Sequence, residues 1–397
     1  MKRLLILVLS LGVSALAMAA PEKLELWAYF DVESQQKVLQ SIISDFNKSQ
    51  SNVEVVFEYV PFENFRQKLT IGLAADTMPD LVFIDNPDNA SYAGLGAFAD
   101  ISDLVKNWEG NGKFFPGPWK STQYNGKQYG VPANSNCLAL YYDKKALAAA
   151  GVKVPTTWDE LRAAAKKLTT PNRYGLAISA VKSEEGTFQY LPWFLSTGAD
   201  VTKVNSAAGV KSLAFLRSLV ADKSMSQEVI NWSQSDAEKQ FASGRAAMMI
   251  NGPWNLGAVK SDAPSLDFGI ANVPRDKQYS SVLGGENLAI TKTANRTAAW
   301  EFVKFFCSKE MLNKYNTAVG TFPPRSDAIG PKDIWSTDPY LAGFAEQLKT
   351  AMPRGPHPRW PEISNALSQA LQKGLLAVAT PQAALDEAQA AIAKALK

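Results

Sequence analysis

The segment AEKQFASGRAAMMINGPWNLGAV, residues 237–259, decides the fold. Its polar first part predicts a helix that ends at Gly244, because glycine adopts the left-handed conformation that closes many helices. The apolar run AAMMI, residues 246–250, then predicts a buried strand. Gly252 and the proline after it turn the chain into another helix, whose first turn holds Trp254. This segment predicts α/β structure, and it leaves open whether Trp254 fills the core or faces a ligand.

The start of the chain repeats this alternation of strands and helices. Apolar runs at residues 24–30, 53–59 and 81–84 alternate with helical segments at 34–49 and 62–75. Such alternation gives a parallel sheet covered by helices. A further strand-to-helix passage, YGVPANSNCLALYYDKKAL, follows a stretch rich in glycine and proline and marks entry into another lobe. Since 397 residues exceed the roughly 250–300 that a single core organises, we expect two lobes.

Two pairs of residues have the spacing of a capping box, in which an N-cap hydroxyl is followed three positions later by an acid. Thr157 with Glu160, and Ser235 with Glu238, therefore each predict the start of a helix.

The first nineteen residues have the pattern of a secretory signal. Lys2 and Arg3 precede an apolar run that ends in an A-x-A cleavage site. We expect cleavage near Ala19/Ala20 and a periplasmic mature chain, with no cysteine at the site to carry a lipid. Beyond the signal, no apolar run approaches the roughly 20 residues that span a membrane.

Charge and composition exclude several classes of function. Without Lys2 and Arg3 the basic count falls from 41 to 39 against 38 acidic residues, so the mature net charge is +1 and no nucleic-acid partner is expected. A single histidine, and two cysteines without metal-ligand spacing, give no reason to expect a metal, a cofactor or a catalytic constellation. Cys137 and Cys307 could form a disulfide or remain two buried thiols.

Polar and aromatic residues stand where the predicted strands end, and ligands of open α/β sheets bind at the carboxyl ends of strands. Such side chains suit a hydroxylated ligand, because each sugar hydroxyl both donates and accepts a hydrogen bond. The candidates are Phe30, Asp31, Glu33, Asp85, Asn86, Asn134, Asn136 and Trp254. Helix caps and turns use the same residue types, so a purely structural role stays open for each. Gly284 and Gly285 before Glu286 allow either close approach to a ligand or a tight turn.

Five long motifs occur in a fixed order: YGVPANSNCLALYYDKKAL, PTTWDELRAAAKKL, AEKQFASGRAAMMINGPWNLGAV, GGENLAITKTANRTAAWEFVKFF and PRWPEISNALSQAL. With them, the chain resembles the extracellular solute-binding proteins of ABC importers, in the carbohydrate-binding group that includes maltose-binding protein. The resemblance covers essentially the whole mature chain. It implies an α/β, two-lobed periplasmic binding protein fold, type II-like, with a hinge and a ligand cleft between the lobes. The implied N-terminal lobe is 20–130 plus 261–322, and the implied C-terminal lobe is 131–260 plus 323–397.

The resemblance also assigns residues to the cleft. It places Trp254 and Asn136 against the ligand, together with the loops that hold Asp31 and Asp85, and it puts Trp193 and Trp232 among the aromatic residues of the second lobe. The helix after RWPEIS carries Leu367 where maltose-binding members have a further ring, so a long maltodextrin platform is not expected. The two cysteines would belong to different lobes, and a disulfide would oppose hinge closure, so we expect free thiols.

The function that this resemblance implies is capture of a sugar by a non-enzymatic, monomeric protein that delivers it to a membrane permease with a cytoplasmic ATPase. One alternative is a phosphorylated polyol such as glycerol phosphate, held by Arg325 or Arg354. The other is a periplasmic glycoside-acting enzyme that uses Asp85 and Glu286 as its acid and base.

Overall fold

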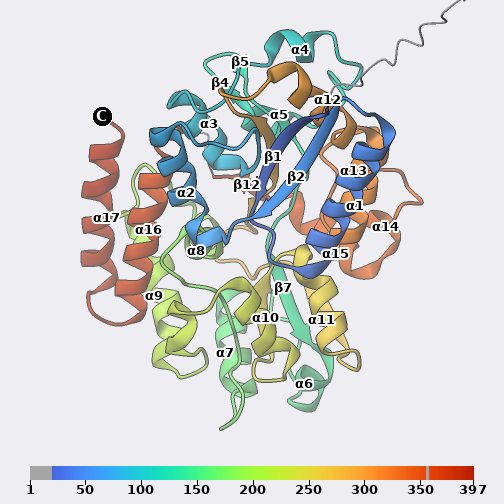
Figure 1. Cartoon of the computed structure of the whole chain (residues 1–397). Helices are drawn as coiled ribbons and strands as arrows, with labels where there is room; N and C mark the ends of the chain where they lie inside the picture. The colour runs from blue at the N-terminus through green and yellow to red at the C-terminus, as the bar shows by residue number, and fades with distance from the viewer. Residues whose placement is uncertain (1–19, 355–356) are drawn as a thin grey trace, which may run out of the picture.

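The structure, a computed structural model, describes residues 20–354 and 357–397, and the predicted signal at 1–19 lies outside this range. Two lobes, each built around its own sheet, confirm the predicted two-lobed α/β fold (Figure 1). The sheet of the first lobe has the strand order β2-β1-β3-β11-β6. Its strands are β1 (Glu22–Ala28), β2 (Val53–Tyr59), β3 (Leu81–Asp85), β6 (Val131–Pro132) and β11 (Glu286–Ile290).

The first three strands run parallel, as the alternating pattern predicted, and β11 runs antiparallel to β3. Helices cover this sheet because their apolar residues recur at the helical period, as Val38, Ile42 and Phe46 do on α1. The helices of the first lobe are α1 (Glu33–Ser49), α2 (Phe62–Ala75), α3 (Asn86–Gly94), α4 (Ser102–Lys106), α5 (Pro116–Ser121), α12 (Arg296–Phe306) and α13 (Lys309–Val319), with a hairpin of β4 (Gln123–Tyr124) and β5 (Lys127–Gln128).

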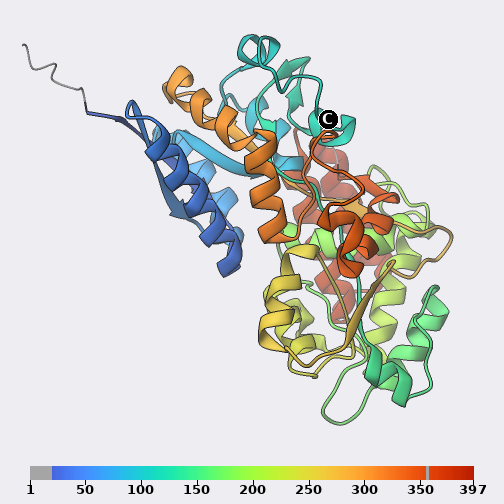
Figure 2. The same cartoon turned by 90° about the vertical axis from the view of Figure 1, so that its right-hand side faces the viewer.

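The second lobe is built on a three-stranded antiparallel sheet of order β8-β7-β9. Its strands are β7 (Ala139–Asp143), β8 (Met248–Asn251) and β9 (Phe268–Ala271). Its helices are α6 (Lys144–Ala149), α7 (Trp158–Leu168), α8 (Glu184–Ser196), α9 (Ala207–Ala221), α10 (Gln234–Ala242), α11 (Leu256–Asp262), α14 (Ile334–Thr337), α15 (Pro339–Leu348), α16 (Trp360–Leu375) and α17 (Pro381–Ala395), with 3₁₀ turns η1 (Gln227–Ile230) and η2 (Pro253–Asn255). In the turned view, the blue elements of the first lobe and the green elements of the second lie at opposite ends of the molecule (Figure 2).

Three chain segments lie side by side where the lobes meet. Ser135 exchanges backbone hydrogen bonds with Phe322 at 2.7 and 2.8 Å, and Asn136 exchanges them with Gly284 at 3.1 and 2.9 Å. The pairing of β10 (Ser281–Leu283) with β12 (Ala351–Pro353) adjoins this crossing. Narrow crossings of this kind are where hinge closure takes place.

The structure corrects part of the expected division into lobes. The expected division places residues 261–322 in the first lobe, yet β9, within that range, pairs with β7 in the sheet of the second lobe. The chain therefore returns to the first lobe only at β11. The crossing expected at residue 130 also comes later, because β6 still pairs with β11 in the first sheet. A short apolar strand looks the same in either lobe, and only its hydrogen-bonded partner decides its place.

Local predictions can be compared with the structure directly. The capping box at Thr157 and Glu160 is confirmed. The box expected at Ser235 and Glu238 is wrong, because Ser233 and the acid three residues later form it instead. Serines at 233 and 235 offer the same hydroxyl, so spacing alone could not choose between them.

The two cysteines are free and lie in separate buried clusters, as expected. Among the residues that the structure describes, no helix combines the length and the apolar character needed to cross a membrane.

Candidate functional site

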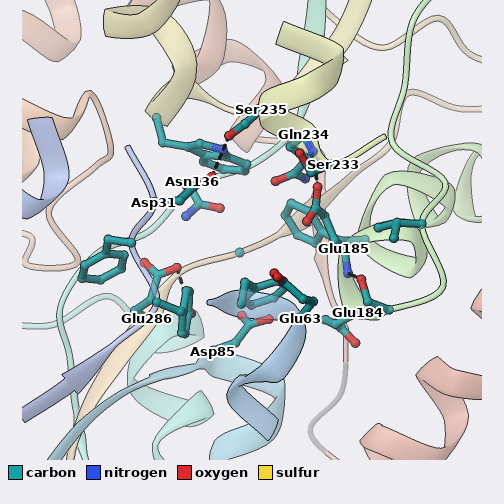
Figure 3. A pocket seen from close by; sticks show the side chains of 18 of the residues that line it. Asp31, Glu63, Asp85, Asn136, Glu184, Glu185, Ser233, Gln234, Ser235 and Glu286 are labelled. Carbon is teal, nitrogen blue, oxygen red and sulfur yellow. Dashed lines mark hydrogen bonds between the residues drawn. The ribbon is translucent and has the colours of Figure 1, made fainter. Parts of the chain in front are cut away.

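A cavity of about 480 Å³ lies between the lobes, and side chains of both lobes line it (Figure 3). The first lobe contributes the carboxyl ends of β1 and β3 and the start of β11, so the cavity occupies the edge where open α/β sheets bind ligands. The second lobe contributes the N-terminal turns of α8 and α10 and the turn after β8. A ligand in this cavity would contact both lobes at once.

A buried ion-pair network forms one wall of the cavity. Arg354, only 5% exposed, binds the carboxylate of Asp85 through both Nη atoms, and its Nη1 also donates to Glu184 Oε1 at 2.7 Å. Arg66 on α2 donates to Glu184 Oε2 at 2.8 Å and makes a two-pronged pair with Asp88. Burial alone would raise the pKa of Glu184, but the two guanidinium groups lower it below its ordinary value. The network joins the two lobes, since Glu184 belongs to the second lobe and both aspartates to the first.

Glu286 lies beside this network, since it stands opposite Asp85 in the pairing of β11 with β3, and it forms no salt bridge among the described residues. Its carboxylate accepts hydrogen bonds from the Tyr29 hydroxyl at 3.2 Å and from the side-chain amide of Asn134. Burial, helped by the nearby charge of Asp85, raises the pKa of Glu286 to about 7. This group can therefore both donate and accept a hydrogen bond near neutral pH.

A third group of polar side chains lies where α8 and α10 begin. Glu185 accepts a hydrogen bond from the backbone N–H of Gln234, and burial, with repulsion from Asp31, raises the pKa of Glu185 to about 8. The Ser235 hydroxyl donates to Asp31 Oδ2 at 2.7 Å across the cleft (Figure 3). This hydrogen bond connects the lobes on the side of the cavity away from the ion-pair network.

Trp254 is held at the cavity by its neighbour Gly252. A β-carbon on Gly252 would lie only 2.0 Å from the indole ring, so the ring packs directly over the glycine backbone. The indole is partly buried, packs against the cores of both lobes and faces Phe188 at a centroid distance of 6.2 Å. Trp254 therefore both packs against the hydrophobic cores and lines the cavity.

Most of the residues predicted from the sequence come together here. The cavity is lined by Phe30, Asp31, Asp85, Asn136, Trp254, Gly284, Gly285, Glu286 and Arg354. Gly285 has φ +139°, and a β-carbon there would meet the backbone of Asn134 at 2.4 Å, which explains the glycine at this approach.

The other predicted residues do not line the cavity. Asn86 and Asn134 lie one layer behind it, where they bond to Arg354 and Glu286. Glu33 is exposed and pairs with Lys37 on α1.

Trp193 and Trp232 are also absent from the cavity lining. Trp193 is 0% exposed and packs against Trp158 and Phe215 in the core of the second lobe, because α8 turns that side away from the cleft. Trp232 packs against the apolar clusters of the same lobe. An aromatic residue in a helix of the second lobe, as Trp193 is, or just before one, as Trp232 is, carries no sequence signal that separates the cleft from the core.

Sequence reasoning missed the polar residues of the second lobe. They are Ser183, Glu184, Glu185, Asn231, Ser233, Gln234, Ser235 and Asp236. Serines and acids are also what helix N-termini prefer, so their sequence pattern indicates capping alone. Their position against the cavity follows from the packing of the two lobes.

A cavity enclosed between two hinged α/β lobes and lined by both defines a two-lobed binding protein. The chain belongs to the bacterial extracellular solute-binding protein family, whose model matches residues 41–343. It is 28% identical to the maltotriose-binding protein of Pyrococcus abyssi over 366 residues. This match covers 85% of this chain and 75% of that protein.

Solved structures give the same result. An ABC transporter solute-binding protein from Thermotoga lettingae, bound with α-D-tagatose, matches 95% of this chain and 100% of its own with a TM-score of 0.86 and 28% identity. The GacH receptor of Streptomyces glaucescens, solved unliganded and with acarbose, matches 95% of this chain and 99% of its own with a TM-score of 0.85 and 25% identity.

Proposed function

We propose that this protein is the sugar-binding component of an ABC importer, and that it captures a monosaccharide or short oligosaccharide by closing its two lobes. The observation that carries the proposal is the cavity lined by carboxylates, amides and aromatic rings from both lobes. A ligand that contacts both lobes binds the closed form better than the open form and so shifts the population toward closure. The sugars bound by the related proteins support the class of ligand.

The dimensions of the site favour a short ligand. A volume of about 480 Å³ lies in the lower part of the range of small-molecule pockets, roughly 300–1,000 Å³. Leu367 is fully buried in the core of the second lobe, and Trp193 is buried with it, so neither extends the cavity as an aromatic platform.

The electrostatics weigh against a phosphorylated polyol. Arg354 already binds Asp85, Glu184 and Asn86, and the surrounding carboxylates would repel a phosphate. Arg325 lies outside the cavity lining and binds Asp327.

Catalysis by Asp85 and Glu286 is also disfavoured. Both oxygens of the Asp85 carboxylate are bound by Arg354, so Asp85 is not free to act as the partner of Glu286 in acid and base catalysis, and the related proteins are binding proteins. We therefore assign no enzymatic activity to the chain. Incubation of candidate oligosaccharides with the protein, followed by product analysis, tests this point, and turnover would contradict it.

We further propose where the protein acts and with which partners. It acts as a monomer in the periplasm after cleavage near Ala19/Ala20, and it delivers the sugar to membrane permease subunits that a cytoplasmic ATPase drives. Membership of an extracellular solute-binding family supports this setting.

Titration calorimetry against monosaccharides, short oligosaccharides, polyols and phosphorylated polyols tests the ligand class, and small-angle scattering with and without ligand tests closure. We expect a sugar to bind and to reduce the radius of gyration. A response to the phosphorylated compounds alone would reject the sugar proposal.

A further inference from the structure

Asn134 is buried behind the cavity and contacts two residues that line it. Only 3% of its surface is exposed, and it lies just after β6, where the chain leaves the first lobe. Its Nδ2 donates to Glu286 Oε2, and its Oδ1 accepts from Asn136 Nδ2 at 3.3 Å. Glu286 and Asn136 both line the cavity (Figure 3), so Asn134 connects them from behind.

The backbone fixes the orientation of the Asn134 amide. Its Oδ1 also accepts from the backbone N–H of Glu286 at 3.4 Å, and a backbone N–H can only donate. The amide oxygen must therefore lie on that side, and the Nδ2 group faces the Glu286 carboxylate. The two segments are held together by their main chains as well, since the Ala133 N–H donates to the Glu286 carbonyl at 2.8 Å.

This orientation leaves oxygen acceptors for a ligand. A carboxylate has roughly four lone-pair positions, and on Glu286 the Asn134 amide and the Tyr29 hydroxyl fill two of them. Because Asn136 Nδ2 faces Asn134, its Oδ1 faces away, and this oxygen accepts no hydrogen bond within the part of the chain that the structure describes. Gly284 leaves room for that oxygen, since a β-carbon there would lie only 2.1 Å from it. We call Glu286 and Asn136 the acceptor pair.

We propose that Asn134 is a positioning residue that holds the acceptor pair as acceptors, and that the ligand therefore donates hydroxyl hydrogens to both Glu286 and Asn136. The inference rests on the proposed function as a sugar-binding protein and adds which side of the cavity requires hydroxyl donors. A hydroxyl that donates to a carboxylate makes a stronger hydrogen bond than one that donates to a neutral oxygen. The strength of this contact therefore depends on whether Glu286 is ionised.

The ionisation of Glu286 depends in turn on the Asn134 donor. Burial and the charge of Asp85 raise the pKa of Glu286 to about 7, and the hydrogen bond from Asn134 opposes this rise. Loss of that donor raises the pKa further, so the carboxyl group keeps its proton at neutral pH and can donate instead of accept. The charged and titratable groups that face Glu286 from the neighbouring elements are Tyr29, Asp85, Tyr315 and Arg354.

The pH dependence of the unliganded protein tests the positioning role. Asn316→Ala is the matched control for Asn134→Ala, because Asn316 is also buried and binds the same segment, at the Ala133 carbonyl, through a side chain that makes no hydrogen bond to Glu286. As the pH rises from about 6 to about 8.5, Glu286 of the wild type loses its proton and its carboxylate keeps the Asn134 donor. In urea unfolding we expect the folding equilibrium constant of Asn134→Ala, relative to wild type, to fall about tenfold over this range. That of Asn316→Ala should keep a constant ratio to wild type.

An isosteric change repeats the test without opening a cavity. Asn134→Asp keeps the size of the side chain but sets a second carboxyl group against Glu286, and two adjacent carboxylates do not both ionise readily. Its folding equilibrium constant relative to wild type should fall over the same pH range by at least as much as that of Asn134→Ala.

Titration calorimetry tests the ligand side of the proposal. The probes are D-glucose, D-galactose, D-mannose and maltose, with analogues in which one hydroxyl at a time is replaced by fluorine, which cannot donate a hydrogen bond. For a sugar that binds, we expect at least two replacements to weaken binding to the wild type, the larger loss being about tenfold. Both losses should shrink to a few-fold or less in Asn134→Ala and should persist in Asn316→Ala.

The outcomes separate this inference from the proposed function. Fluorinated analogues that bind the wild type as tightly as their parent sugars would overturn the requirement for donors and leave sugar binding intact. The same pH dependence in Asn134→Ala and Asn316→Ala would overturn the positioning role of Asn134. No binding by any sugar would overturn the proposed function together with the ligand side of the inference, whereas the pH comparison needs no ligand and decides the positioning role by itself.

Discussion

Replacing Arg354 with alanine should destabilise the protein mainly because it leaves two buried carboxylates, those of Asp85 and Glu184, without this guanidinium. Asp85 and Glu184 are 6% and 3% exposed, and Arg354 is the only cation that pairs with Asp85 in the described structure. Breaking a buried ion pair by removing one partner costs about 3–5 kcal/mol. Arg66 still holds Glu184 in the variant, so we expect the lower end of this range, about 3 kcal/mol. For a chain of this length that corresponds to a fall in Tm of about 4 °C.

The loss should depend on pH with a definite sign. Burial already raises the pKa of Asp85 in the wild type, where Arg354 opposes that shift, so removal of the guanidinium raises the folded-state pKa further above the unfolded value of about 3.9. A carboxyl group whose pKa is higher in the folded state than in the unfolded state does not lower the free energy of unfolding at a pH below its unfolded pKa. It lowers that free energy increasingly as the pH rises from the unfolded pKa to the folded pKa. The deficit of the variant relative to the wild type should therefore be largest at neutral and alkaline pH and should shrink toward pH 4.

Urea unfolding followed by tryptophan fluorescence measures both effects. Arg359→Ala is the matched control, because Arg359 lies five residues away and its ion pair with Glu362 is exposed, which predicts a change within about 1 kcal/mol. Arg354→Lys keeps the charge but loses the two-pronged contact, so it should fall between the alanine variant and the wild type. If Arg354→Ala unfolded at the same urea concentration as Arg359→Ala, or lost the same stability at pH 4.5 and 7.5, the ion-pair argument would be refuted.

Three further changes test the cavity. Trp254→Ala should weaken ligand binding about tenfold or more in titration calorimetry. The same change should lower the unfolding free energy of the unliganded protein by only about 1–2 kcal/mol, less than for a fully buried tryptophan; equal affinity with a large loss of stability would return the ring to the core. Gly252→Ala should weaken binding similarly, because its backbone at φ −96° accepts alanine and the indole must move. Gly257→Ala should leave affinity unchanged, because a β-carbon there would meet only Ser34 Oγ, at an ordinary contact distance of 3.9 Å. Glu185→Gln should flatten the pH dependence of unliganded stability, because a pKa raised to about 8 makes Glu185 stabilising at low pH and unfavourable as pH rises toward 8; a wild-type urea midpoint that does not fall between pH 5 and 8 would contradict this.

Local sequence pattern determined much of the fold. The strands and helices of the first lobe follow from apolar periodicity, and the capping box at Thr157 marks the start of α7, because these signals act over a few residues and need no distant partner. The residues at the carboxyl ends of β1 and β3 could also be predicted as ligand-binding candidates from the sequence, since parallel strands of such sheets bring those ends together.

Only the tertiary structure decided which lobe β9 joins, because strand pairing is made with residues far along the chain. The same holds for Asp85 and Arg354, which are 269 residues apart and meet where the two lobes join. Trp254 and Trp193 look alike in the sequence as tryptophans near helices, yet one lines the cavity and the other is buried. The sequence determined where strands, helices and turns form, since these depend on neighbouring residues. The packing of the two lobes decided which polar and aromatic side chains face the ligand, because burial and charge pairing depend on what lies opposite in space.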